Sequence, residues 1–319
     1  MARRVRAQAG LSLVELMVAV TIGLLIVAAL TALFVKSSSA RREIERSAEM
    51  QESGRYALQF LRNEIAHAGF YGPLVGPTGS TDLPCSTTVS EWSDSLLLHV
   101  SASNDDDITT RFACIAGTGA TARKAGTDAI FVQRAATCSV GESGCDPQVA
   151  GTAYLQVSGC GNEYSTQPFV AAVAPSATAS APFALHKKDC TTQAPLRRFV
   201  RRIFFVANDN SLRYVDLGPD GPTAPVLVSA GVENLQFSYA IDSDADGSPN
   251  SYSAAPDAAS LPNTVGVRVW LLARSTEEGL APEGKSYQLD TLNLSPTDRL
   301  KRHVYASYIS FITPAGAKE

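Results

Sequence analysis

Oxygen-bearing side chains alternate along the segment DSDADGSPNSY, residues 242–252. Its three acids and the glycine after them occupy positions 1, 3, 5 and 6 of a calcium-binding loop. In such a loop, alternate carboxylates turn round a glycine and surround a hard cation with about six to eight oxygen atoms. The spacing therefore predicts a Ca²⁺ site, the one cofactor that the sequence suggests. Its candidate ligands are the side chains of Asp242, Asp244, Asp246 and Asn250 and the carbonyl group of Ser248.

This loop departs from the calcium pattern at position 12, where Ser253 replaces the bidentate glutamate. No helical pattern flanks the loop, and Asp257 is the next acid that could substitute. Asp, Gly, Ser, Pro and Asn are also the ordinary residues of an exposed turn. We therefore favour a metal-free acidic turn, with calcium binding as the alternative.

A single carboxylate, Glu15, interrupts the uncharged hydrophobic run from Leu11 to Val35. That run is long enough to cross a bilayer, which takes about 20 residues. An acid in the middle of a membrane helix costs about 2.5–3.5 kcal/mol on insertion scales, and less near the end, where Glu15 lies. We therefore expect a partner that neutralises this charge.

The residues on either side of the run predict its orientation. Arg3, Arg4 and Arg6 precede it without any acid, and basic residues stay on the cytoplasmic side. The chain beyond Lys36 is therefore expected outside the cytoplasm. A cleaved secretory signal is the alternative, with cleavage in the small-residue run 37–40, but its apolar core would be only about 7–15 residues long.

All six cysteines lie beyond the hydrophobic run, within one third of the chain. An even number in an exported domain predicts disulfides. Zinc binding is the alternative, although no Cys-x-x-Cys pair supports it. Six cysteines allow fifteen pairings, and closing the shortest loops along the chain gives Cys85–Cys114, Cys138–Cys145 and Cys160–Cys190.

Neither the charge nor the polar motifs predict catalysis or nucleic-acid binding. Without the three arginines of residues 1–10, Lys and Arg fall from 27 to 24 against 31 acids, a net charge of −7, which disfavours polyanionic partners. The four histidines are scattered, with no His-Glu-x-x-His or Gly-x-Ser-x-Gly motif. We therefore expect no enzymatic activity.

The N-terminal residues predict one continuous helix. No proline precedes Pro73, so residues 11 to about 69 can form a helix close to 90 Å long, at about 1.5 Å per residue. Its centre is charged, and an apolar stripe follows at helical spacing, formed by Leu58, Leu61, Ile65 and Ala68. A helix that is apolar all round, then polar, then amphipathic passes from lipid to water and docks on a domain.

Two later segments alternate apolar and polar residues, as half-buried strands do. They are ENLQFSYAI at 233–241, in which Leu235, Phe237 and Tyr239 share one face, and TVGVRVWLL at 264–272. Shorter strands are expected at 95–100, 129–135, 153–158, 199–207, 211–216, 225–229 and 304–312. The expected fold class is α+β, a long N-terminal helix packed on an antiparallel β-rich head with a disulfide-stapled insertion.

Two further segments complete this organisation. LRRFVRRIFFV at 196–206 carries four arginines; it is either an edge strand guarded by charge or a docking face for an acidic partner. The Ala/Ser/Pro-rich run 170–182 is typical of a surface loop. The expected parts are a leader (1–10), a membrane-spanning helix half (11–35), an amphipathic helix half (36–70) and a β-rich head (71–319) with a cysteine-rich insertion at about 80–195.

The basic leader that ends in Gly10, the glutamate five residues later and the apolar helix together resemble a type IV prepilin. In that family the prepilin peptidase cuts after the glycine and methylates the new N-terminus. The resemblance implies cleavage between Gly10 and Leu11, N-methylation of Leu11 and a role of Glu15 in assembly. The family more often has phenylalanine where this chain has Leu11.

The new α-amine supplies the partner that Glu15 requires. An α-amine has a pKa near 8 and is largely protonated at neutral pH. Opposite charges about 4 Å apart attract by about 4 kcal/mol at an effective dielectric constant near 20, before desolvation. Glu15 either neutralises the amine of its own chain, one helical turn away, or pairs with the amine of a neighbouring subunit. The leader motif favours the second interpretation.

Two further blocks narrow the resemblance. QESGRYALQFLRNEIAHAGFYG at 51–72 is similar to the segment after the pilin helix in PilW-type minor pilins. LVSAGVENLQFSYAID at 227–242 and VGVRVWLLARS at 265–275 resemble their C-terminal half. The resemblance implies a low-copy type IV pilus subunit that primes assembly and lies at or near the tip. The alternatives are a J-type pseudopilin of a type II secretion system and a membrane-anchored exported binding protein or enzyme.

The resemblance also implies a location and a set of partners. The subunit would cross the inner membrane once, with a cytoplasmic leader and a periplasmic head, and would then enter the extracellular pilus that serves adhesion and twitching motility. Its expected partners are the prepilin peptidase, other minor pilins, the major pilin and the inner-membrane assembly platform, with a tip adhesin as a further candidate. No nucleic acid is expected.

Overall fold

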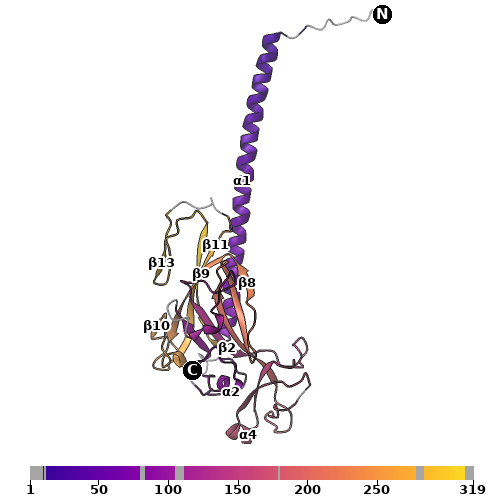
Figure 1. Cartoon of the computed structure of the whole chain (residues 1–319), viewed down its shortest axis with the longest axis vertical. Helices are drawn as coiled ribbons and strands as arrows, with labels where there is room; N and C mark the ends of the chain where they lie inside the picture. Colours follow the sequence, from indigo (N-terminus) through magenta and orange to yellow (C-terminus); the bar gives the residue numbers. More distant parts are fainter. Residues whose placement is uncertain are drawn as a thin grey trace, which may run out of the picture. The chain divides into compact units, whose positions relative to one another are not determined.

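The computed structural model describes residue 10 and residues 12–79, 83–104, 111–178, 180–277 and 284–312. The chain forms two compact units, Met1–Glu49 and Met50–Glu319, and we call the second unit the head (Figure 1). Leu11 lies outside the described residues.

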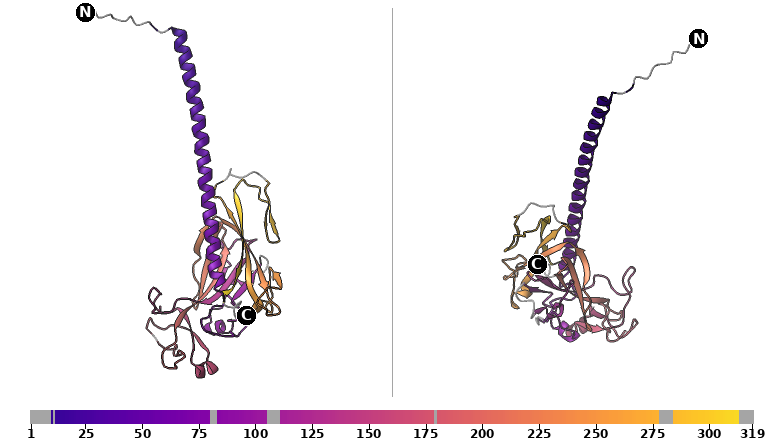
Figure 2. Two further views of the ribbon diagram at one scale, coloured as in Figure 1. Left: turned by 180° about the vertical axis from the view of Figure 1, so that it is seen from behind. Right: turned by 45° about the horizontal axis from the view of Figure 1, so that its top comes forward.

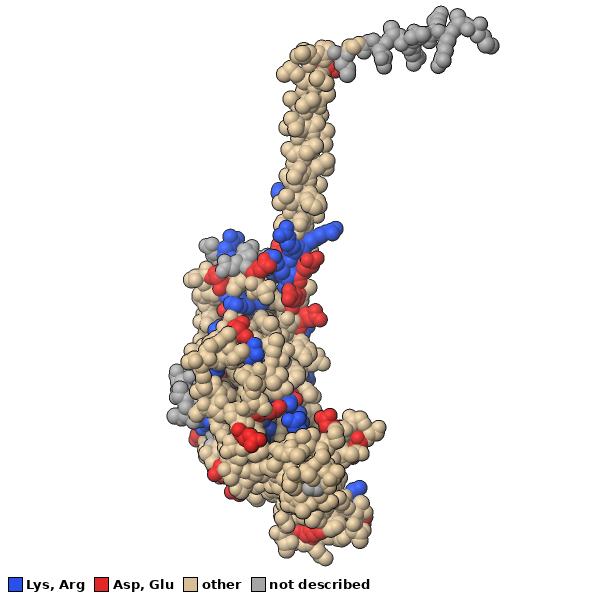
Figure 3. Space-filling model, turned by 45° about the vertical axis from the view of Figure 1, so that its right-hand side comes forward, with Lys and Arg blue, Asp and Glu red and all other residues tan. Residues whose placement is uncertain are grey.

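One helix, α1, runs from Leu13 to Ala66 over 54 residues, close to the span predicted from the absence of proline. From Leu13 to Val35 its side chains are exposed and, apart from Glu15, uncharged; Figure 3 shows this stretch with few charged atoms. Among the described residues, α1 is the one helix long and apolar enough to cross a membrane, by length and composition. After Ala66 a turn follows in which Gly69 has a φ of +76°, which glycine adopts without strain.

The head begins inside α1, at Met50, well before residue 71. Ala57, Leu61 and Ile65 are fully buried, because the apolar stripe of α1 packs into the main core together with strands from two sheets. The last turns of α1 are therefore part of the head and complete its core.

The larger sheet has eight strands and follows the order β1-β2-β5-β3-β4, with β6 pairing β5 and with β7 and β8 pairing β6. All of its pairings are antiparallel. Its strands are β1 (Val100–Ser103), β2 (Ala129–Ala135), β3 (Ala153–Val157), β4 (Phe169–Val173), β5 (Leu196–Val206), β6 (Ser211–Gly218), β7 (Gly221–Pro222) and β8 (Val226–Ala230). Short helical segments lie in its connections: α2 (Val89–Ser93), η1 (Ala113–Ile115) and α4 (Gly161–Thr166).

The second sheet has four antiparallel strands in the order β10-β9-β11-β14. They are β9 (Val232–Ile241), β10 (Ser251–Ser253), β11 (Thr264–Arg274), which follows η2 (Leu261–Asn263), and β14 (Arg302–Ser310). A hairpin of β12 (Tyr287–Leu289) and β13 (Leu292–Leu294) packs beside it. Leu235, Phe237 and Tyr239 are at most 1% exposed, so the predicted inner face of β9 is confirmed, as is the α+β fold class. Figure 2 shows the hairpin and α4 at opposite ends of the head.

The expectation that the arginine-rich strand lies at an edge is wrong. β5 pairs with β2, β3 and β6 and therefore lies inside the sheet, with neighbours along both of its edges. Its arginines are not edge guards, because each binds a group inside the head. Arg201, 2% exposed, donates hydrogen bonds to three carbonyl groups of residues 83–86, and its guanidinium lies 4.6 Å from the Trp92 ring centroid. Burial lowers its pKa to about 9, against the opposing effect of Tyr71.

Two shorter expectations are also corrected. The first part of 95–100 is a turn, and β1 begins only at Val100, because the backbone N–H of Leu97 bonds to the carbonyl of Gly79 instead of a strand. The start of the run expected as a loop at 170–182 belongs to β4, which pairs along the full length of β3.

Three disulfides link the cysteines in the pairs given by the shortest closures: Cys85–Cys114, Cys138–Cys145 and Cys160–Cys190. No cysteine of the chain is free. The first pair packs beside Phe112 and Phe205, in the core on the face of the large sheet opposite α1. The other two pairs close loops next to β2 and α4.

Candidate functional site

The predicted processing and assembly residues lie at the start of α1. No atom of the described residues beyond the chain neighbours of Gly10 lies within 4 Å of the position that its Cβ would take. Glu15 is exposed in the first turn of the helix, and within the described residues it has no ion-pair partner. The uncharged surface that follows is suited to lipid or to the apolar helices of other subunits.

A buried ionic cluster joins α1 to the large sheet, and sequence reasoning did not find it. Glu64 is 5% exposed and lies 3.1 Å from the guanidinium groups of Arg134 on β2 and of Arg202 on β5. Arg202 also lies 2.6 Å from Asp216 on β6, and its guanidinium lies 4.5 Å from the Tyr214 ring centroid. Hydrogen bonds and charges from these carboxylates raise the pKa of Arg202 although burial acts in the opposite direction. The sequence did contain one indication of this cluster: Glu64 directly precedes Ile65 in the apolar stripe of the helix, so a buried carboxylate that needs a cationic partner could have been expected.

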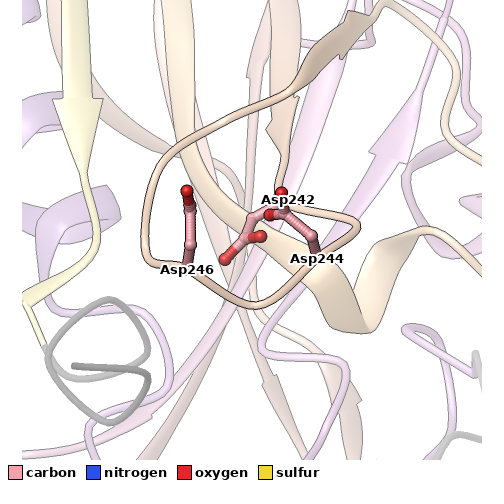
Figure 4. A group of neighbouring side chains, drawn as sticks. All are labelled: Asp242, Asp244 and Asp246. Carbon is pink, nitrogen blue, oxygen red and sulfur yellow. The ribbon is translucent and has the colours of Figure 1, made fainter.

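The predicted calcium loop brings its three acids together directly after β9. One carboxylate oxygen from each of Asp242, Asp244 and Asp246 lies within 4.8 Å of the others, and Figure 4 shows the three side chains inside one turn of the loop. Asp242 is 1% exposed, whereas Asp244 and Asp246 are exposed. The loop therefore brings three oxygen atoms close enough together to be ligands of one cation.

Hydrogen bonds hold this loop in shape. Asp242 accepts from the backbone N–H groups of Ala245 and Gly247, at 2.7 and 3.1 Å. Ala245 and Gly247 have φ of +62° and +86°, so the glycine at position 6 fits a left-handed turn. The Asn250 amide donates to Asp244 at 3.1 Å and accepts from the backbone N–H of Ser243 at 2.7 Å. The loop therefore has internal partners for much of its polar surface.

The remaining candidate ligands are placed differently. The backbone N–H of Ser248 donates to Asp246 at 2.7 Å. Asp257 does not join the three acids, because its carboxylate accepts from the backbone N–H of Ser260 at 2.8 Å. Hydrogen bonds from the side chain and the backbone N–H of Ser260 lower the pKa of Asp257. Of the candidates, Asp242, Asp244 and Asp246 form the cluster.

Comparison with known proteins identifies both ends of the chain. Residues 5–31 match the prokaryotic N-terminal methylation motif. Residues 203–312, from within β5 to just beyond β14, match the type IV pilus-assembly protein W family. These two matches support a type IV pilus minor pilin of the PilW type. Members of this class are structural subunits that associate with other pilins and with the assembly machinery.

Comparisons with solved structures and with curated proteins show little further similarity. A solved structure, a type IV-like pilin from Thermus thermophilus, is similar to this pilin with a TM-score of 0.38 and 11% identity, over 83% of this chain and 97% of that one. No curated protein matches the chain. The assignment of this pilin to its family therefore rests on the two sequence matches. Its methylation motif and apolar helix fit a membrane-anchored subunit.

Proposed function

We propose that this pilin is a low-copy structural subunit that primes assembly of a type IV pilus and lies at or near the tip. The observation that carries the proposal is the pairing of the methylation motif at residues 5–31 with the PilW match over residues 203–312 in one chain. The first supplies entry into a filament, and the second distinguishes this subunit from a generic pilin. We propose no enzymatic activity.

Processing and topology follow from the same proposal. The prepilin peptidase removes residues 1–10 and methylates Leu11, and the head faces the periplasm before the subunit enters the filament. Glu15 then pairs with the N-terminal amine of a neighbouring subunit in the apolar interior of the filament, where the attraction between the two charges offsets their burial. The other minor pilins, the major pilin and the assembly platform are the proposed partners, with a tip adhesin as a further candidate.

A clean deletion of the coding sequence tests this function. We expect loss of surface pili and twitching while type II secretion continues, and restoration of both by the wild-type copy. Lost secretion with normal piliation would instead identify a J-type pseudopilin. Normal behaviour in both assays would contradict a role in either filament.

The variant Glu15→Val tests the pairing within that function. Removing the charge makes membrane insertion easier, so we expect normal processing and membrane levels but reduced recovery in sheared filaments. Full complementation of piliation by Glu15→Val would rule out the intersubunit pair for this subunit.

A further inference from the structure

A groove of about 570 Å³ lies in the head, on the face of the large sheet that also carries α1. We call it the arginine groove, because Arg134, Arg198 and Arg202 all line it. Arg198 and Arg202 lie four residues apart on β5, and Arg134 pairs in register with Val200, midway between them. Since side chains alternate across a strand, the three arginines share one face.

Two of these arginines form close ion pairs with carboxylates, whereas the third, Arg198, has a longer ion pair. Arg134 and Arg202 bind Glu64, and Arg202 also binds Asp216. The Arg198 side chain is 45% exposed and has one ion pair among the described residues, at 3.6 Å to the same Asp216. Three guanidinium groups therefore face two carboxylates along this row.

The wall opposite these strands is fixed in place. It is formed by the segment 144–149, which the Cys138–Cys145 disulfide ties to the residues after β2. The backbone N–H of Val149 donates to the hydroxyl group of Tyr154 on β3, at 2.8 Å. A groove with a covalently held wall loses little freedom when a partner enters it.

The groove has an apolar rim beside its cationic floor. Val140, Pro147 and Val149 contribute apolar lining, and Val149 is 53% exposed. Asp146 also lines the groove from the exposed segment, but no ion pair joins it to Arg198 in the described part of the chain. An apolar rim around a partly paired guanidinium suits a short segment with one acid between apolar residues.

We propose that the arginine groove receives an aspartate or glutamate side chain from a surface segment of a neighbouring pilus subunit. Glu64 on α1 binds two of the three arginines, Arg134 and Arg202. The incoming carboxylate binds the third arginine, Arg198, in the same way. The groove volume lies in the range of sites that hold ligands of a few residues. That the segment comes from a pilus subunit rests on the proposed function. That it carries an acidic side chain rests on the residues that line the groove.

Site-specific photo-crosslinking in piliated cells tests the proposal with the full-length chain. A photoreactive amino acid replaces Val149 at the groove rim, and Leu227, which is equally exposed on β8, serves as the control position. Mass spectrometry of the crosslinked peptides should identify a segment of another pilus subunit that contains Asp or Glu. A neutral or basic segment, or no crosslink at all, would overturn the proposal.

Charge variants then test the role of Arg198. We expect Arg198→Glu to lower the crosslink yield from position 149 about tenfold, or about 1.4 kcal/mol, and exposed Lys188→Glu to leave it unchanged. Lysine in place of the acid on the partner should restore the yield with Arg198→Glu, which a merely unfolded variant would not allow. Arg198→Gln, whose level and disulfides can be matched to wild type, should give an intermediate loss, and an undiminished yield in both variants would overturn the proposal.

The outcomes separate the groove from the proposed function. An acidic crosslinked segment in a secretion pseudopilin would support the groove while overturning the pilus function. Loss of pili in the deletion strain together with no crosslink at position 149 would support the function while overturning the groove.

Discussion

The carboxylate of Glu64 on α1 lies 3.1 Å from the guanidinium of Arg202 on β5, and 138 residues of sequence separate the two. The pair joins the last turns of the long helix to the centre of the large sheet. Both side chains are largely buried, at 7% and 14% exposure. Removing one charge would leave the other desolvated without its partner.

We therefore expect Glu64→Gln to lower the free energy of unfolding of the head by about 3–5 kcal/mol. Denaturant unfolding of the full-length protein in detergent, followed by the fluorescence of Trp92 and Trp270, measures the change. Glu52→Gln on the exposed face of α1 is the matched control and should cost less than about 0.5 kcal/mol. Equal costs for the two variants would show that the ion pair does not hold the helix.

Gly54 is a second point at which the last turns of α1 contact the strands of the head. A Cβ at this position would overlap the Tyr305 ring of β14, with Cζ at 2.9 Å, and the Tyr305 hydroxyl donates to the carbonyl of Gln51. Glycine to alanine inside a helix normally stabilises by about 1 kcal/mol. Here we expect Gly54→Ala to destabilise by about 1–3 kcal/mol, because the ring must shift.

Two comparisons check the cause of that loss. Gly23→Ala, where a Cβ would have open space, should leave unfolding of the head unchanged. Tyr305→Leu combined with Gly54→Ala should recover part of the loss. A Gly54→Ala protein as stable as wild type would show that Tyr305 moves aside freely.

The sequence predicted those elements that have a local pattern. The inner face of β9 and the start of β11 follow from period-two alternation, and α1 follows from a proline-free run. The disulfides could be predicted because each links two cysteines that are consecutive along the chain. The Glu64 cluster and the central place of β5 were missed for one reason: the carboxylates and carbonyl groups that bind the four arginines come from distant segments. Without those partners in view, four arginines suggest an exposed edge.

The same limit applies to the head boundary and to β4. Met50 and Gly54 lie on a helix face whose burial depends on β14, at the far end of the chain. β4 has a small-residue sequence, and pairing with β3 rather than intrinsic preference makes it a strand. At the candidate calcium loop, spacing predicted that the three acids meet, but not that Asp257 bonds to the backbone of Ser260 instead.

Acid should weaken the C-terminal part of the head through Asp298. Hydrogen bonds from Arg302, whose side chain is 2% exposed, are the largest cause that lowers the pKa of Asp298 to about 2. A depressed carboxyl pKa contributes stability above the ordinary value near 4, and that contribution disappears as the pH falls toward 2. We expect Asp298→Asn to cost about 1 kcal/mol at pH 7, since the exposed part of the pair is screened, and nothing near pH 2.

Unfolding of the full-length protein at pH 7, 4 and 2 measures this dependence. Asp290→Asn in the turn between β12 and β13 is the control for replacing an aspartate of the head and should cost less than about 0.5 kcal/mol at pH 7. A cost of Asp298→Asn that stays constant down to pH 2 would contradict an ionised carboxylate as its source.

Calcium binding is to be tested where the carboxylates of Asp242, Asp244 and Asp246 meet. A site without the bidentate acid at position 12 should bind calcium with a dissociation constant of about 10⁻⁴–10⁻³ M, as extracellular calcium sites do. Calorimetry should use the full-length protein, since a chain begun at residue 71 would lack the buried residues of α1. No heat at millimolar calcium, or equal heat from Asp244→Asn/Asp246→Asn, would leave a metal-free acidic turn.

Processing should depend on Gly10. Among the described residues no atom beyond its chain neighbours lies within 4 Å of the position that a Cβ of Gly10 would take, so a block in Gly10→Val would report on the peptidase rather than on packing within the chain. We expect the variant to accumulate as a full-length precursor in the membrane fraction. A processed Gly10→Val protein would place the cleavage elsewhere.

The N-terminus of the mature protein tests membership of the pilin pathway most directly. Mass spectrometry of the protein from membranes and from sheared filaments should find an N-terminal peptide that begins with N-methylated Leu11. A chain that begins at Arg41, as a secretory signal cleaved in the run 37–40 would leave it, or an unprocessed Met1, would contradict the account.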